Sequence, residues 1–131
     1  MKRILSVALL GLLVSPIGCN PFAPDQSVEL GVSKLDAPAS ISSGSSFAVV
    51  LTVVLGGCLS FDRIDVDRST ASATFTVWGK DASKGRKDIV CPDNIIQEPH
   101  TYQLNPPFSS PFQITVNNGR LPPLTATVQV Q

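Results

Sequence analysis

The sequence predicts an all-β domain made of two packed sheets. Short apolar runs alternate with polar residues and are separated by Gly, Pro, Ser and Asn. No stretch of about ten or more residues beyond the N-terminal region carries a helical period. About seven short strands in roughly 100 residues suit a sandwich of the immunoglobulin-like or fibronectin-like kind better than a barrel.

The first half of the domain contains a half-buried strand and a more deeply buried one. In residues 27–33, valine and leucine alternate with polar residues, which predicts a strand that ends before a loop over 36–46. Residues 47–55 are apolar on both parities except at Thr52, as expected for a central strand. Gly56-Gly57 then turns the chain.

A hairpin is expected next, from residues 58–68 and 73–78 with a tight turn at Ser69-Thr70. One side of its first strand is apolar and the other is charged. Residues 79–99 lack a sustained pattern and are expected to form a long loop. The remaining strands are expected at 101–104, 112–117 and 124–130, with a turn at Asn118-Gly119.

The N-terminal region has the pattern of an export signal. Lys2 and Arg3 precede the apolar run Ile4 to Val14, and Ser15 to Gly18 lead directly into Cys19. This arrangement resembles the lipobox of bacterial lipoproteins, in which the cysteine thiol is diacylated and the signal is cut in front of it. The resemblance implies lipidation (palmitate) on Cys19, and therefore a membrane partner that is reached through lipid.

Three regions are therefore expected: a signal peptide over 1–18, a lipid-anchored tether over 19–26 and a β-sandwich over 27–131. The apolar run of 11 residues is too short to span a bilayer as a helix, which needs about 20. Without the two signal cations, eight basic residues face ten acidic ones. This balance argues against nucleic acid as a partner, because such binders carry a basic stripe.

The chain has three cysteines, an odd number for an exported protein. Lipidation of Cys19 would leave Cys58 and Cys91 to form a disulfide, with two free buried thiols as the alternative. A bridge over this loop would stabilise the fold by about 3 to 4 kcal/mol.

The cysteine flanks resemble those of small bacterial envelope lipoproteins. The residues that carry the resemblance are Gly56-Gly57-Cys58-Leu59-Ser60-Phe61, Val77-Trp78-Gly79 and Val90-Cys91-Pro92. The resemblance implies a single disulfide-stapled, immunoglobulin-like domain in an adhesion, assembly or accessory role, and it implies no ligand.

Few residues suggest chemistry. His100 is the single histidine and is expected to be an exposed or capping group at a strand start, so catalytic triads and histidine metal sites lack members. Asp62, Asp65 and Asp67 are expected to form a solvent face paired with Arg63 and Arg68, with a cation site as the alternative. We therefore expect no enzyme, no catalytic residues, no metal and no cofactor.

Trp78 is the residue most suggestive of binding. It lies on the polar parity of its strand, so an exposed ring could contact protein or glycan. The competing interpretation places it in the core against the disulfide, because a one-residue register error would turn it inward.

The expected function is that of a non-enzymatic lipoprotein of the bacterial cell envelope, on the periplasmic or cell-surface side. It would act as an interaction or structural module for an envelope protein or glycan. One alternative is a soluble secreted binding module, should Pro16 in the lipobox block processing. The other is a protease inhibitor that presents the loop over residues 79–87.

Overall fold

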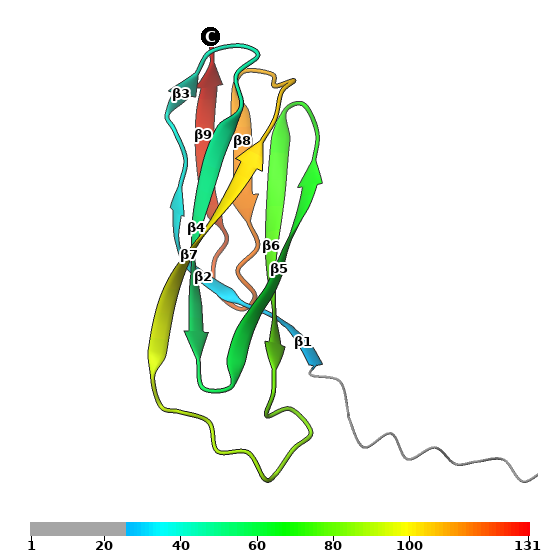
Figure 1. Ribbon diagram of the computed structural model, residues 1–131. Coiled ribbons are helices and arrows are strands. Elements are labelled where there is room, and N and C mark those ends of the chain that lie inside the picture. Colours follow the sequence, from blue (N-terminus) through cyan, green and yellow to red (C-terminus); the bar gives the residue numbers. More distant parts are fainter. Residues whose placement is uncertain (1–25) are drawn as a thin grey trace, which may run out of the picture.

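Two β-sheets pack face to face, and turns and loops connect their strands at both ends of the domain (Figure 1). The structure is a computed structural model that describes residues 26–131. The expected all-β sandwich is confirmed, with nine strands in this range instead of about seven. Within the same range, no helix is long and apolar enough to cross a membrane.

The larger sheet has six strands and the smaller sheet has three. The larger sheet is built from β1 (Gln26–Glu29), β3 (Ser40–Ile41), β5 (Leu59–Arg68), β6 (Ser72–Asp81), β8 (Phe112–Val116) and β9 (Leu124–Val130). The smaller sheet is built from β2 (Gly31–Asp36), β4 (Phe47–Gly56) and β7 (Ile95–Leu104).

Strand β6 organises the larger sheet. It pairs with β5 along one side, and along its other side with β1 at one end and β8 at the other. The order then continues through β9 to β3, and the β6–β8 and β3–β9 pairings are parallel. In the smaller sheet β4 lies between β2 and β7, and both pairings are antiparallel.

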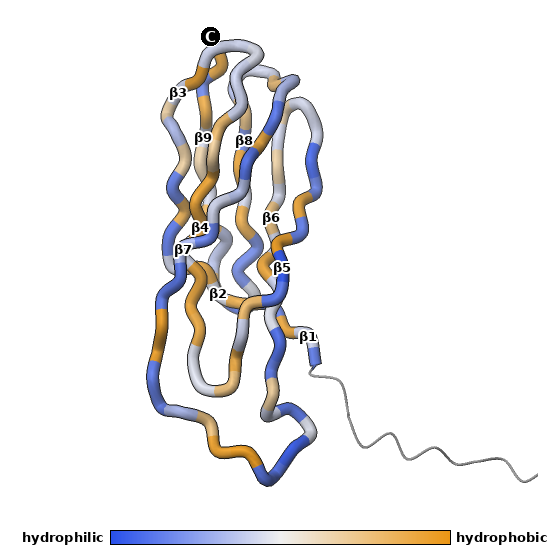
Figure 2. The backbone as a smooth tube through the Cα atoms, viewed as in Figure 1, coloured by the Kyte–Doolittle hydropathy of each residue, from blue (hydrophilic) through white to orange (hydrophobic). Residues whose placement is uncertain are grey.

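The core lies between the sheets and follows the period of two that a strand imposes. In β4 every second residue is buried and the others are half-buried or exposed, and β6 shows the same alternation. Figure 2 shows the resulting alternation of hydrophobic and hydrophilic residues along the strands. The largest fully buried side chains are Phe75, Phe112, Leu30, Leu51, Leu104 and Ile114.

The first expected strand is in fact two strands, one in each sheet. Residues before Leu30 pair with β6, and residues after it pair with β4. Leu30 is 1% exposed, and its amide donates to the Val77 carbonyl at 2.9 Å. The alternation of side chains continues through the crossing, so the sequence pattern could not show that the strand changes sheets.

Two expected loops are shorter than predicted. The loop over 36–46 contains β3 and begins only after Asp36, and the loop over 79–99 shrinks to 82–94 because β6 runs to Asp81 and β7 starts at Ile95. Pro99 argues against a strand, yet β7 is an edge strand, where a missing N–H that points away from the neighbour is tolerated. The expected tether 19–26 ends inside β1, and its other residues lie outside the described range.

A buried asparagine joins the β8–β9 loop to β2. The Asn118 side chain, 7% exposed, accepts from the Val32 amide at 2.7 Å and donates to the Val32 carbonyl at 3.1 Å. The β2–β4 register shifts between Val32 and Lys34, so the sheet is irregular at this point. The Asn118 side chain takes the place of a neighbouring strand as the hydrogen-bond partner of the Val32 backbone. The turn expected at Asn118-Gly119 is confirmed, and the amide of Gly119 donates to the Glu29 carboxylate at 2.7 Å.

We predict that Gly79→Ala destabilises the domain by about 1 to 3 kcal/mol, through overpacking at the crossing. A Cβ there would lie 2.5 Å from the Ser60 carbonyl oxygen and 2.7 Å from the Leu30 methyl groups. Gly31→Ala is the matched control, because its Cβ would meet only Asn118 Oδ1 at 3.8 Å. Urea unfolding would measure both, and equal effects would contradict the explanation.

We also predict that Asn118→Ala costs about 2 to 4 kcal/mol, because both polar groups of Val32 would lose their partner in a buried place. The neighbouring Asn117→Ala should cost well under half as much, since Asn117 is exposed and its side chain makes one hydrogen bond, to Thr76 Oγ1 at 2.9 Å. The comparison uses thermal or urea unfolding with the disulfide intact. Similar losses of stability for the two variants would contradict the role given to the Asn118 side chain in holding Val32.

Candidate interaction surfaces

A disulfide between Cys58 and Cys91 connects the β4–β5 turn to the segment between β6 and β7, with the two Cα atoms 5.0 Å apart. The expected pairing is confirmed. Gly57 in this turn has φ +62°, and a Cβ on it would lie 3.4 Å from the Cys91 Cβ. Glycine there provides both the left-handed turn and room for the bridge. We call the turn 56–58 and the segment 82–96 the disulfide pole.

The segment expected to act as an inhibitory loop is folded back on itself. Residues 79–81 belong to β6, and the chain then forms two successive turns, Lys84 to Asp81 and Arg86 to Ser83. The Asp81 carboxylate accepts from the amide and hydroxyl of Ser83 at 2.9 and 2.6 Å. No observation favours the inhibitor alternative.

A groove of about 400 Å³ opens between the edge strands β5 and β7, next to the disulfide pole. Leu55, Leu59 and Phe61 provide apolar walls, and Glu98 and His100 of β7 lie on the opposite side. The groove was not predicted, because residues 95–99 were assigned to a loop. Once β7 includes them, its period of two places Ile96, Glu98 and His100 on one face.

His100 lies in the middle of β7, not at a strand start as expected, and it is not a capping group. Its ring stacks on Phe61 with centroids 3.8 Å apart and an interplanar angle of 18°, joining the two sheets across their open side. The imidazole Nε2 is shielded from solvent and lies 3.4 Å from the Glu98 carboxylate without a hydrogen bond. His100 therefore has a packing role between β7 of the smaller sheet and β5 of the larger sheet.

Both strands that border the groove are poor templates for an added strand. The β5 ladder shifts between Phe61 and Arg63, and the outer parity of β5 carries charged side chains. In β7, Pro99 lacks an amide hydrogen. Bulges, charges and proline on edges are the usual protection against edge-to-edge pairing. These edges are therefore less suited to strand addition than the side-chain surfaces are to binding.

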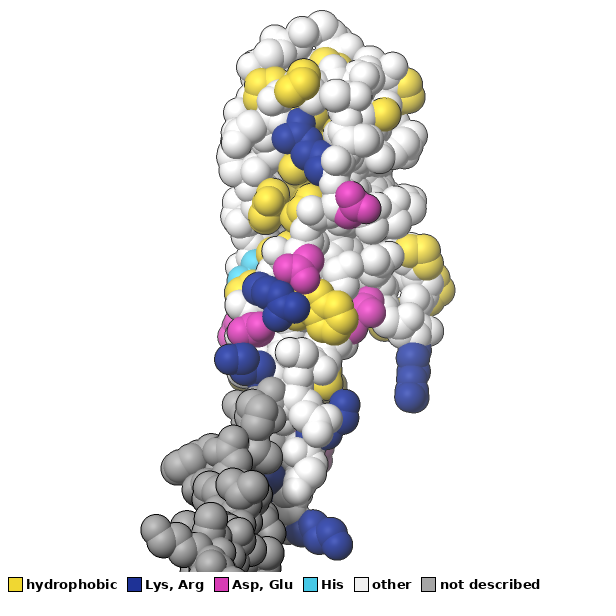
Figure 3. Space-filling model, turned by 90° about the vertical axis from the view of Figure 1, so that its right-hand side faces the viewer, with side chains coloured by type: hydrophobic (Ala, Val, Ile, Leu, Met, Phe, Trp, Pro, Cys, Tyr) yellow, Lys and Arg dark blue, Asp and Glu magenta, His cyan; other side chains and the backbone are white. Residues whose placement is uncertain are grey.

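Trp78 lies on the outer face of the larger sheet, half-buried and outside the core cluster. The core alternative is wrong, because Ala73, Phe75 and Val77 take the inward parity of β6. The Arg63 guanidinium stands 5.5 Å from the Trp78 ring centroid, a cation–π contact. Figure 3 shows charged side chains gathered on this side of the molecule with hydrophobic side chains between them.

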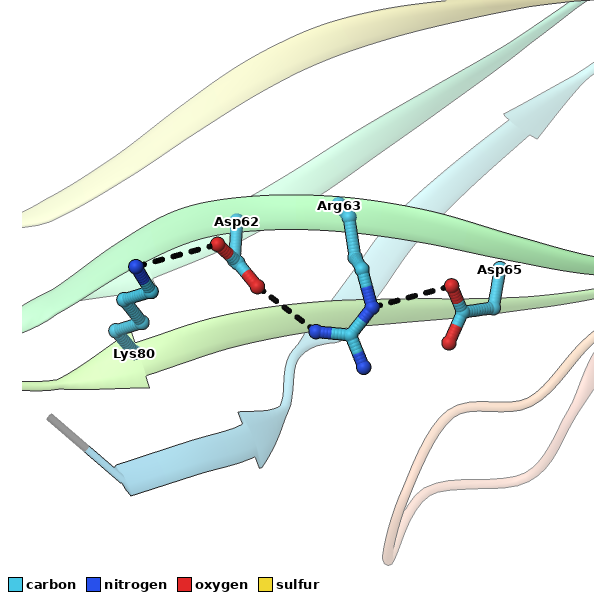
Figure 4. Close-up of polar contacts among 4 residues, drawn as sticks. All are labelled: Asp62, Arg63, Asp65 and Lys80. Carbon is cyan, nitrogen blue, oxygen red and sulfur yellow. Dashed lines mark hydrogen bonds and ion pairs between the residues drawn. The ribbon is translucent and has the colours of Figure 1, made fainter. Parts of the chain in front are cut away.

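Ion pairs run along the same face. Arg63 pairs with Asp62 at 2.8 Å and with Asp65 at 3.2 Å, and Lys80 pairs with Asp62 at 3.5 Å (Figure 4). The hydrogen bond from Arg63 holds the pKa of Asp62 below its ordinary value, and Lys80 adds to the effect. Cations therefore already compensate these carboxylates, and no cluster of three potential metal ligands occurs in residues 26–131.

Arg68 departs from the expected pairing. Its guanidinium donates to the Pro107 carbonyl at 2.9 Å and lies 4.7 Å from the Phe108 ring centroid. It thus attaches the β7–β8 loop to the end of β5, while the expected carboxylate pairing is seen only for Asp62 and Asp65. Sequence spacing on one strand could not reveal a partner 39 residues away.

The disulfide pole also exposes large apolar side chains. Val90 is 93% exposed, Ile95 77% and Ile96 47%, and one other large hydrophobic residue of the described range, Leu121, is comparably exposed at 60%. Single exposed aliphatic residues are ordinary, but three within seven positions beside an apolar groove are a candidate contact surface. In the sequence, the available signal for this surface was that these apolar residues lie in a segment without a strand pattern.

We predict a specific acid sensitivity from Asp62. Its folded-state pKa lies below the unfolded value, so its contribution to stability is present above about pH 4 and is lost as pH falls through the folded pKa. Asp62→Asn should therefore flatten the fall of the urea midpoint on acidification below pH 4. Asp67→Asn, on the same strand but without an ion pair in the described structure, is the control. Identical profiles for both variants would contradict the assignment.

Comparison with known proteins yields no relative for this chain. No family model, no curated protein and no solved structure matches it.

Proposed function

We propose that this chain is an exported, lipid-anchored, non-enzymatic interaction module of the bacterial cell envelope. Lipid on Cys19 would hold it at a membrane, and the sandwich would contact an envelope protein or glycan through its side-chain surfaces. The anchor, the location and the partner class are all parts of this proposal.

The distribution of the cysteines is the observation that carries the proposal. The chain has three, and two of them are joined in the disulfide. A disulfide in a small domain is typical of an oxidising compartment outside the cytoplasm. The remaining cysteine is Cys19, placed directly after the expected export signal, where an acyl chain would be attached.

The outer face of the larger sheet supports an interaction role. Trp78 is half-buried beside Arg63 and Glu29, its neighbours on the adjoining strands. Trp and Arg are the residue types most enriched among energetically important contacts between proteins. The carboxylates nearby are paired with Arg63 and Lys80, and the lowered pKa of Asp62 is the effect that a surface ion-pair network produces.

The experiment is intact-mass measurement, with and without reductant, of the protein expressed from the full sequence in a bacterial host and recovered from its membrane fraction. We expect a species that begins at Cys19, is heavier by its acyl chains and gains two hydrogens when the disulfide is reduced. The acyl mass is expected because it would explain the one cysteine outside the bridge.

Cys19→Ser is the matched control and should move the protein to the soluble fraction with its disulfide retained. A wild-type protein cut elsewhere and free of acyl groups would contradict the anchor. That result would favour the soluble secreted module, as expected if Pro16 in the lipobox blocks processing.

A further inference from the structure

The N-terminal segment enters the domain beside the disulfide pole. In the β1–β6 register, Gln26 is the partner of Asp81, and Asp81 is followed directly by the segment 82–94. Paired strands lie about 5 Å apart, so residue 26 and the start of the pole are immediate neighbours. In Figure 1, β1 begins toward the end that carries the β4–β5 turn and this segment, and the C-terminus lies at the opposite end.

Six residues separate Cys19 from Gln26. Even fully extended, this stretch spans only about 20 to 25 Å. If Cys19 is acylated, a bilayer is therefore held within that distance of the pole, at a high effective concentration. Any membrane contact by the sandwich would involve this end before any other.

The side chains of the pole suit such a surface. Figure 2 shows hydrophobic stretches in this segment between hydrophilic ones. Val90 and Ile95 are 93% and 77% exposed, on opposite sides of Cys91 in the chain, and the disulfide fixes the backbone between them to the domain. A rigid backbone reduces the ordering cost of placing apolar side chains in a headgroup layer.

Charge favours anionic lipid. Lys84, Arg86 and Lys87 lie together in the turns before Val90, and within the described structure neither lysine forms an ion pair. The segment 82–96 holds three basic and two acidic residues, a formal net charge of +1: Arg86 lies 3.7 Å from the Asp88 carboxylate and compensates it, while Asp93 is exposed between Val90 and Ile95. Basic residues beside exposed aliphatic ones are the composition that binds a membrane interface.

We infer that the disulfide pole rests on the surface of an anionic phospholipid bilayer, with Val90 and Ile95 in the headgroup region and Lys84 and Lys87 near lipid phosphates. This inference rests on the proposed lipid anchor. It adds a second contact, made by the protein itself, and an orientation of the domain. The outer face that carries Trp78 is turned sideways, neither toward the bilayer nor away from it, and the end that carries β3 points away from the bilayer.

Limited trypsin digestion tests the contact, because the pole contains three natural cleavage sites, Lys84, Arg86 and Lys87. A Ser43→Arg substitution in the exposed turn at the far end provides an internal reference site. The acylated protein is placed on vesicles of phosphatidylethanolamine and phosphatidylglycerol, and the unacylated Cys19→Ser form is digested in solution. Reducing gels are required, since the disulfide would hold the fragments together.

We expect cleavage at the pole to be about tenfold slower on vesicles than in solution, relative to cleavage at residue 43, because the segment must leave the lipid before it is cut. The acylated double variant Val90→Asp/Ile95→Asp should regain fast cleavage. Ala39→Asp/Ala48→Asp, which adds the same charge at exposed positions away from the pole, should remain protected.

The outcomes separate the two proposals. A protein without acyl mass overturns the anchor and this contact together. A fully acylated protein whose pole is cut as fast on vesicles as in solution overturns the contact alone. Equal protection of residue 43 would show general shielding by the vesicle, and would also overturn the proposed orientation.

Discussion

The passage of the chain from one sheet to the other at Leu30 is the constraint on which the rest of the sandwich depends. Its side chain is buried against Gly79, its amide is bonded to Val77, and the next residues join the smaller sheet. One residue thus holds the central strand of one sheet next to the first strand of the other. The Asn118 side chain fixes the chain two residues later, so the crossing is held by packing on one side and by hydrogen bonds on the other.

The alternation of apolar and polar residues was sufficient to predict the fold class and most strands, but it left the position of Trp78 open, because a register error of one residue would turn the ring inward. It could not reveal the crossing at Leu30, because a strand that changes sheets keeps its period of two. The first half of β7 was missed for a different reason: residues 95–99 show no sustained alternation, and their place in the sheet depends on pairing with β4, which is distant in sequence. The groove and the role of His100 could not be predicted, because both depend on that half of β7.

Long-range contacts account for most of what the sequence could not predict. Asn118 and Val32 are 86 positions apart, and Arg68 and Pro107 are 39 apart. Each depends on a loop meeting a strand that local pattern does not connect. The disulfide was predictable because three cysteines allow very few pairings, whereas an asparagine or an arginine has many possible partners.

The parallel pairing of β9 with β3 has a consequence for how the molecule is made. Strand β9 lies between β8 and β3, and the Val130 amide and the Gln131 amide are bonded to Ser110 and Ile41. A chain that emerges from its N-terminus has β1 and β2 available long before these partners arrive. The larger sheet therefore completes only after synthesis has reached β9, and Val32 stays without its side-chain partner until Asn118 has been made. Until β9 has been made, the edge of β8 that it will occupy is unpaired, so the unfinished chain presents an open sheet edge of the kind that can pair with another chain.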